Sequence, residues 1–179
     1  LDRSSAASDV YKRQVYKEKL RLRAYGTPTD SSPVFLEIKK KYDGVVYKRR
    51  VSTDFAQAMR FLTEGIPPES GDYVARQVTA EMTHMIRRDG LIPRAAVFYD
   101  RRAFHGADDP ELRLTLDGNI RYRLGDLDLR NGTDGDTIPG QPFRIMEIKS
   151  ASSIPLWLAG TLSELGIHPV SYTHLRAHE

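Results

Sequence analysis

Alternation of polar and apolar residues runs through the N-terminal third of the chain. In residues 17–24 every position of one parity is cationic, and most positions of the other parity are apolar. The same period of two continues through 34–41, and 45–51 follows across a turn as the partner strand of a hairpin. Because successive side chains of a strand point to opposite faces, the pattern predicts three strands. The turn residues Tyr42-Asp43-Gly44 join the last two as a hairpin.

Helical spacing of apolar residues follows. Residues 54–64 are predicted to form a helix capped by Ser52 or Thr53 and ended by Gly65. A second helix is predicted over 73–88, ended by Gly90. A last helix is predicted over 157–165, with Trp157 as its anchor in the core.

Strand patterns return between the second and last helices, over 94–102, 112–117, 120–124 and 143–149. The tripeptide Asp117-Gly118-Asn119 predicts a tight hairpin between the middle two. This order of elements predicts an α+β fold with mostly antiparallel strands.

Composition excludes several classes of protein. The 179 residues include no Cys, which excludes disulfides, thiolate nucleophiles and Cys-ligated metals. No apolar run approaches the ~20 residues of a membrane span, so no membrane segment is expected. A P-loop motif is also missing, so ATP would not be held as in P-loop enzymes.

Charge is distributed unevenly. The net charge is only +3, but residues 12–50 hold twelve Lys and Arg against four acidic residues. Such a local excess favours a polyanionic partner. The cations also fall on particular strand faces, and polar faces recur in five segments of the chain.

These faces allow two interpretations. They can be ordinary solvated surface, with Glu37 paired to Lys39 or Lys41. Alternatively, they can line the interior of a closed antiparallel barrel. Lys and Arg in such an interior would bind a chain of phosphates, and a few carboxylates among them suit Mg²⁺ or Mn²⁺. The recurrence of one parity over five segments favours the second interpretation.

Five stretches between about Tyr16 and Pro169 carry a family resemblance. They are KEKLRLRAYG, VFLEIKKKYDGVVYKRR, VFYDRRAF, LRLTLDGNIRYR and FRIMEIKSASSIPLWL. In this order they resemble the bacterial polyphosphate-polymerase (VTC) domain of the triphosphate tunnel metalloenzymes. The resemblance implies an eight-stranded antiparallel β-barrel tunnel with flanking helices. It also implies a phosphotransferase that passes the γ-phosphate of ATP to polyphosphate, with Mn²⁺ or Mg²⁺ as cofactor.

The resemblance further implies roles for residues in these motifs. The implied phosphate-binding and catalytic cations are Arg21, Arg23, Lys39, Lys48, Arg50, Arg101, Arg113 and Lys149. Glu147 of the M-E-I-K motif is the implied metal carboxylate, and Glu37 of L-E-I-K is the second metal candidate.

Alternatives to a polymerase remain open. One is a non-catalytic module that binds polyphosphate or inositol phosphates, and another is a tunnel triphosphatase. Glu147 favours catalysis, because polyanion binding alone needs no metal carboxylate. We expect ATP and polyphosphate as ligands, a cytoplasmic location and no nucleic-acid partner, since Phe35 and Tyr47 provide little aromatic interleaving.

The two ends of the chain differ in character from the rest. Residues 1–14 and 171–179 resemble translated adapter sequence, so we interpret them as non-native and 15–170 as an incomplete tunnel domain. The family's opening strands and its closing F-S-K-Y-type segment are not found in this sequence. We therefore expect the chain as printed to be inactive or unstable.

Overall fold

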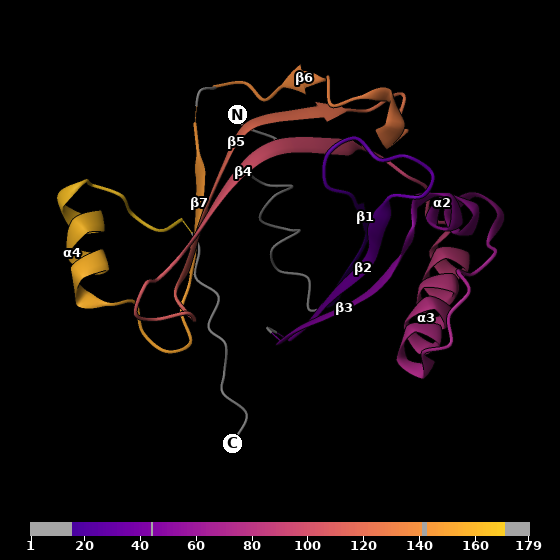
Figure 1. The fold of residues 1–179 in the computed structure, drawn as a ribbon, viewed down its shortest axis with the longest axis horizontal. Helices are drawn as coiled ribbons and strands as arrows, with labels where there is room; N and C mark the ends of the chain where they lie inside the picture. Colours follow the sequence, from indigo (N-terminus) through magenta and orange to yellow (C-terminus); the bar gives the residue numbers. More distant parts are fainter. Residues whose placement is uncertain (1–15, 44, 141–142, 171–179) are drawn as a thin grey trace. The chain divides into compact units, whose positions relative to one another are not determined.

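A computed structural model describes residues 16–43, 45–140 and 143–170. The predicted end segments 1–14 and 171–179 lie outside these ranges. Within them the chain is α+β, with two antiparallel sheets and three α-helices (Figure 1). It divides into two compact units, Leu1–Val97 with Tyr122–Asp136, and Phe98–Arg121 with Thr137–Glu179. The predicted α+β class is confirmed, and each unit is described separately below.

The first unit contains the sheet β1-β2-β3, which is antiparallel throughout. Its strands are β1 (Tyr16–Arg23), β2 (Pro33–Tyr42) and β3 (Val45–Asp54). The three predicted strands are thus confirmed, within three residues at each end. Their alternation gives the sheet two unlike faces, one apolar over most of its length and the other rich in cations.

Helices α2 (Phe55–Glu64) and α3 (Tyr73–Asp89) cover the apolar face (Figure 1). Their apolar residues recur at helical spacing, so each helix presents one stripe to the sheet. The resulting core is formed by Val34, Leu36, Ile38, Val51, Phe55, Ala58, Phe61, Val78, Met82 and Met85. This packing leaves the opposite face of the sheet available for chemistry.

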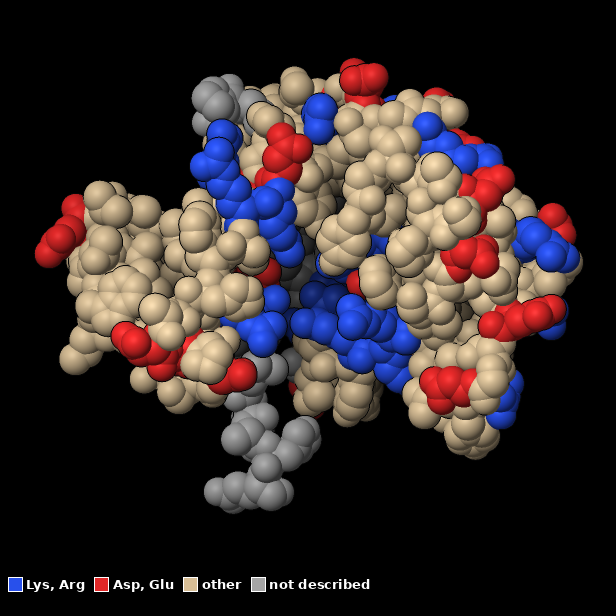
Figure 2. Space-filling view, in the orientation of Figure 1, with Lys and Arg blue, Asp and Glu red and all other residues tan. Residues whose placement is uncertain are grey.

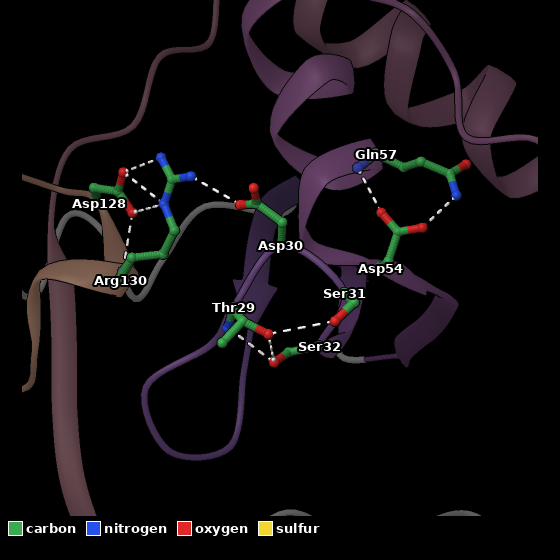
Figure 3. Close-up of polar contacts among 8 residues, drawn as sticks. All are labelled: Thr29, Asp30, Ser31, Ser32, Asp54, Gln57, Asp128 and Arg130. Carbon is green, nitrogen blue, oxygen red and sulfur yellow. Dashed lines mark hydrogen bonds and ion pairs between the residues drawn. The ribbon is translucent and has the colours of Figure 1, made fainter.

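The beginning of α2 corrects one prediction. Ser52 and Thr53 belong to β3, and Asp54 is the N-cap, with its Oδ1 accepting a hydrogen bond of 2.7 Å from the Gln57 amide (Figure 3). The strand runs directly into the helix, so the cap is the first residue whose short acidic side chain can turn back to the helix N–H groups. The predicted stops Gly65 and Gly90 are confirmed, each with a positive φ.

The loop between β1 and β2 is anchored to the start of α2. The amides of Phe55 and Ala56 donate to the carbonyl oxygens of Ser32 and Asp30, each at 3.0 Å. Arg130 donates from Nη1 to Asp30 Oδ1 at 2.9 Å and from Nη2 to Asp128 Oδ2 at 2.6 Å (Figure 3). These contacts hold the loop, and therefore the exit of β1, in a defined position.

Charged residues link α3 to the end of the same sheet that lies near the turn between β2 and β3. On the helix-covered face, Lys40 Nζ lies 2.9 Å from Glu18 and 2.6 Å from Glu81. Arg88 also pairs with Glu18, and Arg49 pairs with Glu81. The Glu18 side chain is only 7% exposed. Burial alone would raise the pKa of Glu18, but hydrogen bonds from Tyr16, Lys40 and Arg88 lower it to about 2.

This network makes stability sensitive to acid. The pKa of Glu18 in the folded protein lies below its ordinary value of 4.5. Its contribution is therefore complete above about pH 5 and is lost as the pH falls towards about 2. We expect Glu18→Gln to lower the free energy of unfolding at pH 7 by about 2 kcal/mol. Urea unfolding from pH 7 to pH 3 should then show a flatter pH dependence in the variant.

The control for this experiment is Glu64→Gln. Glu64 is half exposed and pairs with Arg60 at 3.8 Å, so its loss should change stability by no more than about 0.5 kcal/mol. Equal acid sensitivity in Glu18→Gln and the unmodified protein would contradict the assignment.

The second sheet has the order β4-β5-β6, and β7 also pairs with β5. The strands are β4 (Ala96–His105), β5 (Arg113–Arg123), β6 (Asp136–Thr137) and β7 (Ile145–Lys149). The predicted hairpin at 117–119 is wrong, because β5 passes through these residues as one strand. Asn119 takes a positive φ of 48°, although the chain does not reverse there. The Arg144 side chain lies over Gly118, and a Cβ added at residue 118 would come within 2.7 Å of the Arg144 Nε.

The chain after β7 forms α4 (Leu156–Glu164), as predicted within one residue. The expectation that Trp157 anchors this helix in a core is wrong, since Trp157 is 65% exposed and Leu158 is the buried residue. A one-residue shift turns a helix by about 100°, so the sequence pattern alone did not determine which of the two faces inward. Among the described residues, no helix is long and apolar enough to cross a membrane.

Candidate functional site

The face of β1-β2-β3 opposite the helices is the first candidate site. Within the described strands it carries eight cations, named here the cationic face: Lys17, Lys19, Arg21, Arg23, Lys39, Lys41, Lys48 and Arg50. Figure 2 shows Lys and Arg atoms gathered over the region of this sheet. A single parity on each strand produces the face, and the antiparallel register aligns the three strands.

Register places the cations in rows across the sheet. Arg21, Glu37 and Arg50 are direct cross-strand neighbours, and Lys19, Lys39 and Lys48 form the next row. Same-face residues along one strand are separated by about 7 Å, so the two rows run side by side. Like charges so closely spaced repel one another, and a bound polyanion would relieve that repulsion.

Glu37 is the acidic residue within this face. Arg21 Nε donates to Glu37 Oε2 at 2.8 Å, and Arg23 Nε lies 3.4 Å from Glu37 Oε1. The carboxylate is 17% exposed, so these contacts are partly shielded from water. The alternative that Glu37 pairs with lysines of its own strand is replaced by pairing with arginines of β1. This pairing restrains the guanidinium groups of Arg21 and Arg23 beside the other cations of the face.

A pocket of about 210 Å³ in the second unit is the second candidate site, named here the β5–β7 pocket. Its lining residues are Arg101, Ala103, Phe104, His105, Arg113, Thr115, Glu147 and Lys149. The register pairs Arg113 with Lys149 and Thr115 with Glu147. The pocket thus brings four predicted site residues together from three strands.

Arg101 is held in this pocket by a residue that the sequence analysis did not select. Its Nε and Nη2 donate to the two carboxylate oxygens of Asp117, at 2.6 and 2.7 Å. The guanidinium carbon lies 5.3 Å from the centre of the Tyr99 ring. The hydrogen bond to Asp117 raises the pKa of Arg101, with smaller contributions from Tyr99 and Glu147. Arg101 therefore stays charged and keeps one orientation.

Oxygen donors that suit a hard divalent cation lie in the same pocket. Glu147 is half exposed and lies 3.5 Å from Lys149 Nζ. Thr115 Oγ1 is buried without a hydrogen-bond partner in the described part of the chain. No cluster of three or more His, Asp or Glu is found among the described residues. Mg²⁺ characteristically uses one or two carboxylates and completes its shell with water and substrate phosphates, so Glu147 and Thr115 fit such an ion.

The structure distributes the ten predicted site residues over these two sites. On the cationic face lie Arg21, Arg23, Glu37, Lys39, Lys48 and Arg50. In the β5–β7 pocket lie Arg101, Arg113, Glu147 and Lys149. Glu37 and Glu147, the two predicted metal ligands, belong to different units.

Sequence reasoning missed several residues of both sites. Lys19 shares the parity of Arg21, and His105 shares the parity of Arg101, so alternation alone was a sufficient signal for each. Thr115 and Asp117 share the parity of Arg113 in the predicted strand 112–117, so alternation placed both on its polar face, but neither was selected as a site residue.

The fold and the two sites define a class of protein. It is an α+β protein whose antiparallel strands carry arrays of Lys and Arg with isolated carboxylates among them. A family model of the VTC domain matches residues 6–177, and the chain belongs to this family. Membership supports a role connected with polyphosphate. A search of curated protein sequences found no match.

Proposed function

We propose that this domain is a metal-dependent polyphosphate polymerase that uses ATP as phosphoryl donor. The cationic face carries the proposal, because eight cations on one face of three strands match a linear chain of phosphates. The strands would belong to the eight-stranded tunnel that the family resemblance implies. A cytoplasmic location is part of the proposal.

The chemistry requires alignment and charge neutralisation. An oxygen of the acceptor's terminal phosphate forms a bond to the γ-phosphorus of ATP, the bond to the β–γ bridging oxygen breaks, and ADP leaves. Such a transfer needs little covalent help from the protein. In this proposal Arg21 and Arg23, oriented by Glu37, grip phosphate oxygens, and Lys39 and Lys48 supply further positive charge.

The β5–β7 pocket supplies a second group of residues to the proposal. Within this pocket Arg101, Arg113 and Lys149 would bind phosphate oxygens. Glu147 and Thr115 would hold Mn²⁺ or Mg²⁺, which when bound supplies additional charge stabilisation at phosphate oxygens. The presence of this carboxylate among cations favours a transferase over a module that only binds polyphosphate.

One assay distinguishes the proposal from its alternatives. The domain with the flanking segments of its parent gene is incubated with ATP and Mn²⁺, with an EDTA-treated sample as control. We expect one ADP to be released for each phosphate unit that is added to polyphosphate. Neither product should form in the EDTA-treated sample. Release of orthophosphate alone would instead indicate a triphosphatase. Binding of tripolyphosphate without turnover would indicate a binding module.

A further inference from the structure

An aromatic pair lies at one end of the cationic face and has no part in the function proposed above. The rings of Tyr25 and Phe35 meet edge to face, with centroids 6.1 Å apart and planes at 82°. The guanidinium carbon of Arg50 lies 5.0 Å from the centre of the Phe35 ring. Phe35 stands on the same face as Glu37 and Lys39, directly opposite Arg23 in the register.

Tyr25 is unusually accessible for a large aromatic residue. It is 73% exposed, although its ring contacts another aromatic ring. It lies two residues after the end of β1, and Gly26 after it takes a φ of 67°, which lets the chain turn away from the sheet. The same loop is anchored further along by Asp30, through Arg130 and the start of α2 (Figure 3). The ring is therefore presented on a fixed loop with most of its surface open.

A flat, exposed aromatic ring next to arginines is a platform on which a nucleobase stacks. Along β2, Phe35 is followed on the same face by Glu37 and Lys39, in steps of about 7 Å. A ligand with a base at Tyr25 would therefore extend its phosphates over the two rows of cations. Inorganic polyphosphate has no group that could use this platform.

We infer that Tyr25, with Phe35 and Arg50, forms a subsite for the base of a nucleoside triphosphate. The inference rests on the proposed function, and it assigns the donor end of the ligand to one end of the cationic face. The subsite would let the protein distinguish ATP from inorganic tripolyphosphate, since both carry three phosphates and only ATP carries a base.

The test compares these two ligands. Dissociation constants of ATP and of inorganic tripolyphosphate are measured by calorimetry, in one buffer, on the domain with the flanking segments of its parent gene. We expect Tyr25→Ala to weaken ATP binding about tenfold and tripolyphosphate binding by no more than about twofold. Tyr25→Phe, which keeps the ring, should restore most of the ATP affinity.

A matched control uses the other aromatic pair of this sheet. Tyr42 is 58% exposed and packs edge-on against Tyr16 at the opposite end of β2. Tyr42→Ala should change the affinity for neither ATP nor tripolyphosphate. Lys48→Gln on the cationic face should weaken the binding of both. The base subsite is rejected, and the proposed function stands, if Tyr25→Ala leaves ATP binding unchanged or weakens the binding of ATP and tripolyphosphate equally. If the unmodified domain with its flanking segments binds neither ligand, the subsite and the proposed function both fall.

Discussion

Glu147→Gln is expected to abolish polyphosphate synthesis, with a loss of at least about a hundredfold in rate. The substitution keeps the size of the side chain but removes its charge and replaces one acceptor oxygen with an amide donor. The β5–β7 pocket is also lined by Arg101, Arg113 and Lys149, so in the proposed function the negative charge of Glu147 is what would make binding of a divalent cation favourable there. The measurement is polyphosphate formed from ATP and Mn²⁺ by the domain with its flanking segments.

The same substitution has a second readout on the chain as printed. Tripolyphosphate binding should increase with Mn²⁺ in the unmodified chain and should not respond to Mn²⁺ in Glu147→Gln. Glu164→Gln, which removes an exposed carboxylate at the end of α4 in the same unit, is the control and should retain the response. Synthesis by Glu147→Gln at the unmodified rate would reject the metal assignment.

Phe61→Ala is expected to lower the free energy of unfolding by about 3–5 kcal/mol. Phe61 is 1% exposed and lies in the core between α2 and the apolar face of β1-β2-β3. Removing the ring loses its burial and leaves a cavity that well-packed neighbours fill only in part. Because a domain of this size is stable by only about 5–15 kcal/mol, the change removes a large share of the total.

Urea denaturation followed by circular dichroism measures this loss. Arg60→Ala is the matched control, because Arg60 precedes Phe61 on the exposed side of α2 and its ion pair with Glu64 is long. Its effect should stay within about 0.5 kcal/mol. An equal midpoint for Phe61→Ala and the unmodified chain would show that α2 does not stabilise the sheet.

Strong periodicity made much of the fold predictable. The first three strands and the two helices after them were located within a few residues, because each buries one face and therefore repeats an apolar residue at a fixed spacing. Local turn chemistry was less reliable. Asp117-Gly118-Asn119 has the composition of a hairpin, but pairing with β7 along residues 113–117 and packing of Arg144 over Gly118 keep β5 continuous.

The candidate site shows the same division. Parity placed Arg21 and Arg23 on one face of their strand and Lys39 with Glu37 on one face of the next, and the antiparallel register of the structure joins these faces. Parity did not show that Glu37 pairs with arginines of the neighbouring strand, nor that Asp117 holds Arg101 at both oxygens. Such contacts depend on which strands are neighbours and in which register, and residues far apart in sequence carry no local mark of that.

The alternating residues, the regions where cations concentrate and the family resemblance could all be read from the amino-acid sequence. These are properties of short segments, because the period of a strand or helix is set by backbone geometry within a few residues. Only the tertiary structure decided which charges meet, which carboxylate orients arginines and which lies in a pocket, and that Tyr25 stands beside Phe35 at the end of the cationic face. Strand pairing and helix packing bring residues that are far apart in sequence within hydrogen-bonding and ion-pairing distance. Electrostatic interactions are strong only at such short distances, so a binding site depends on this packing.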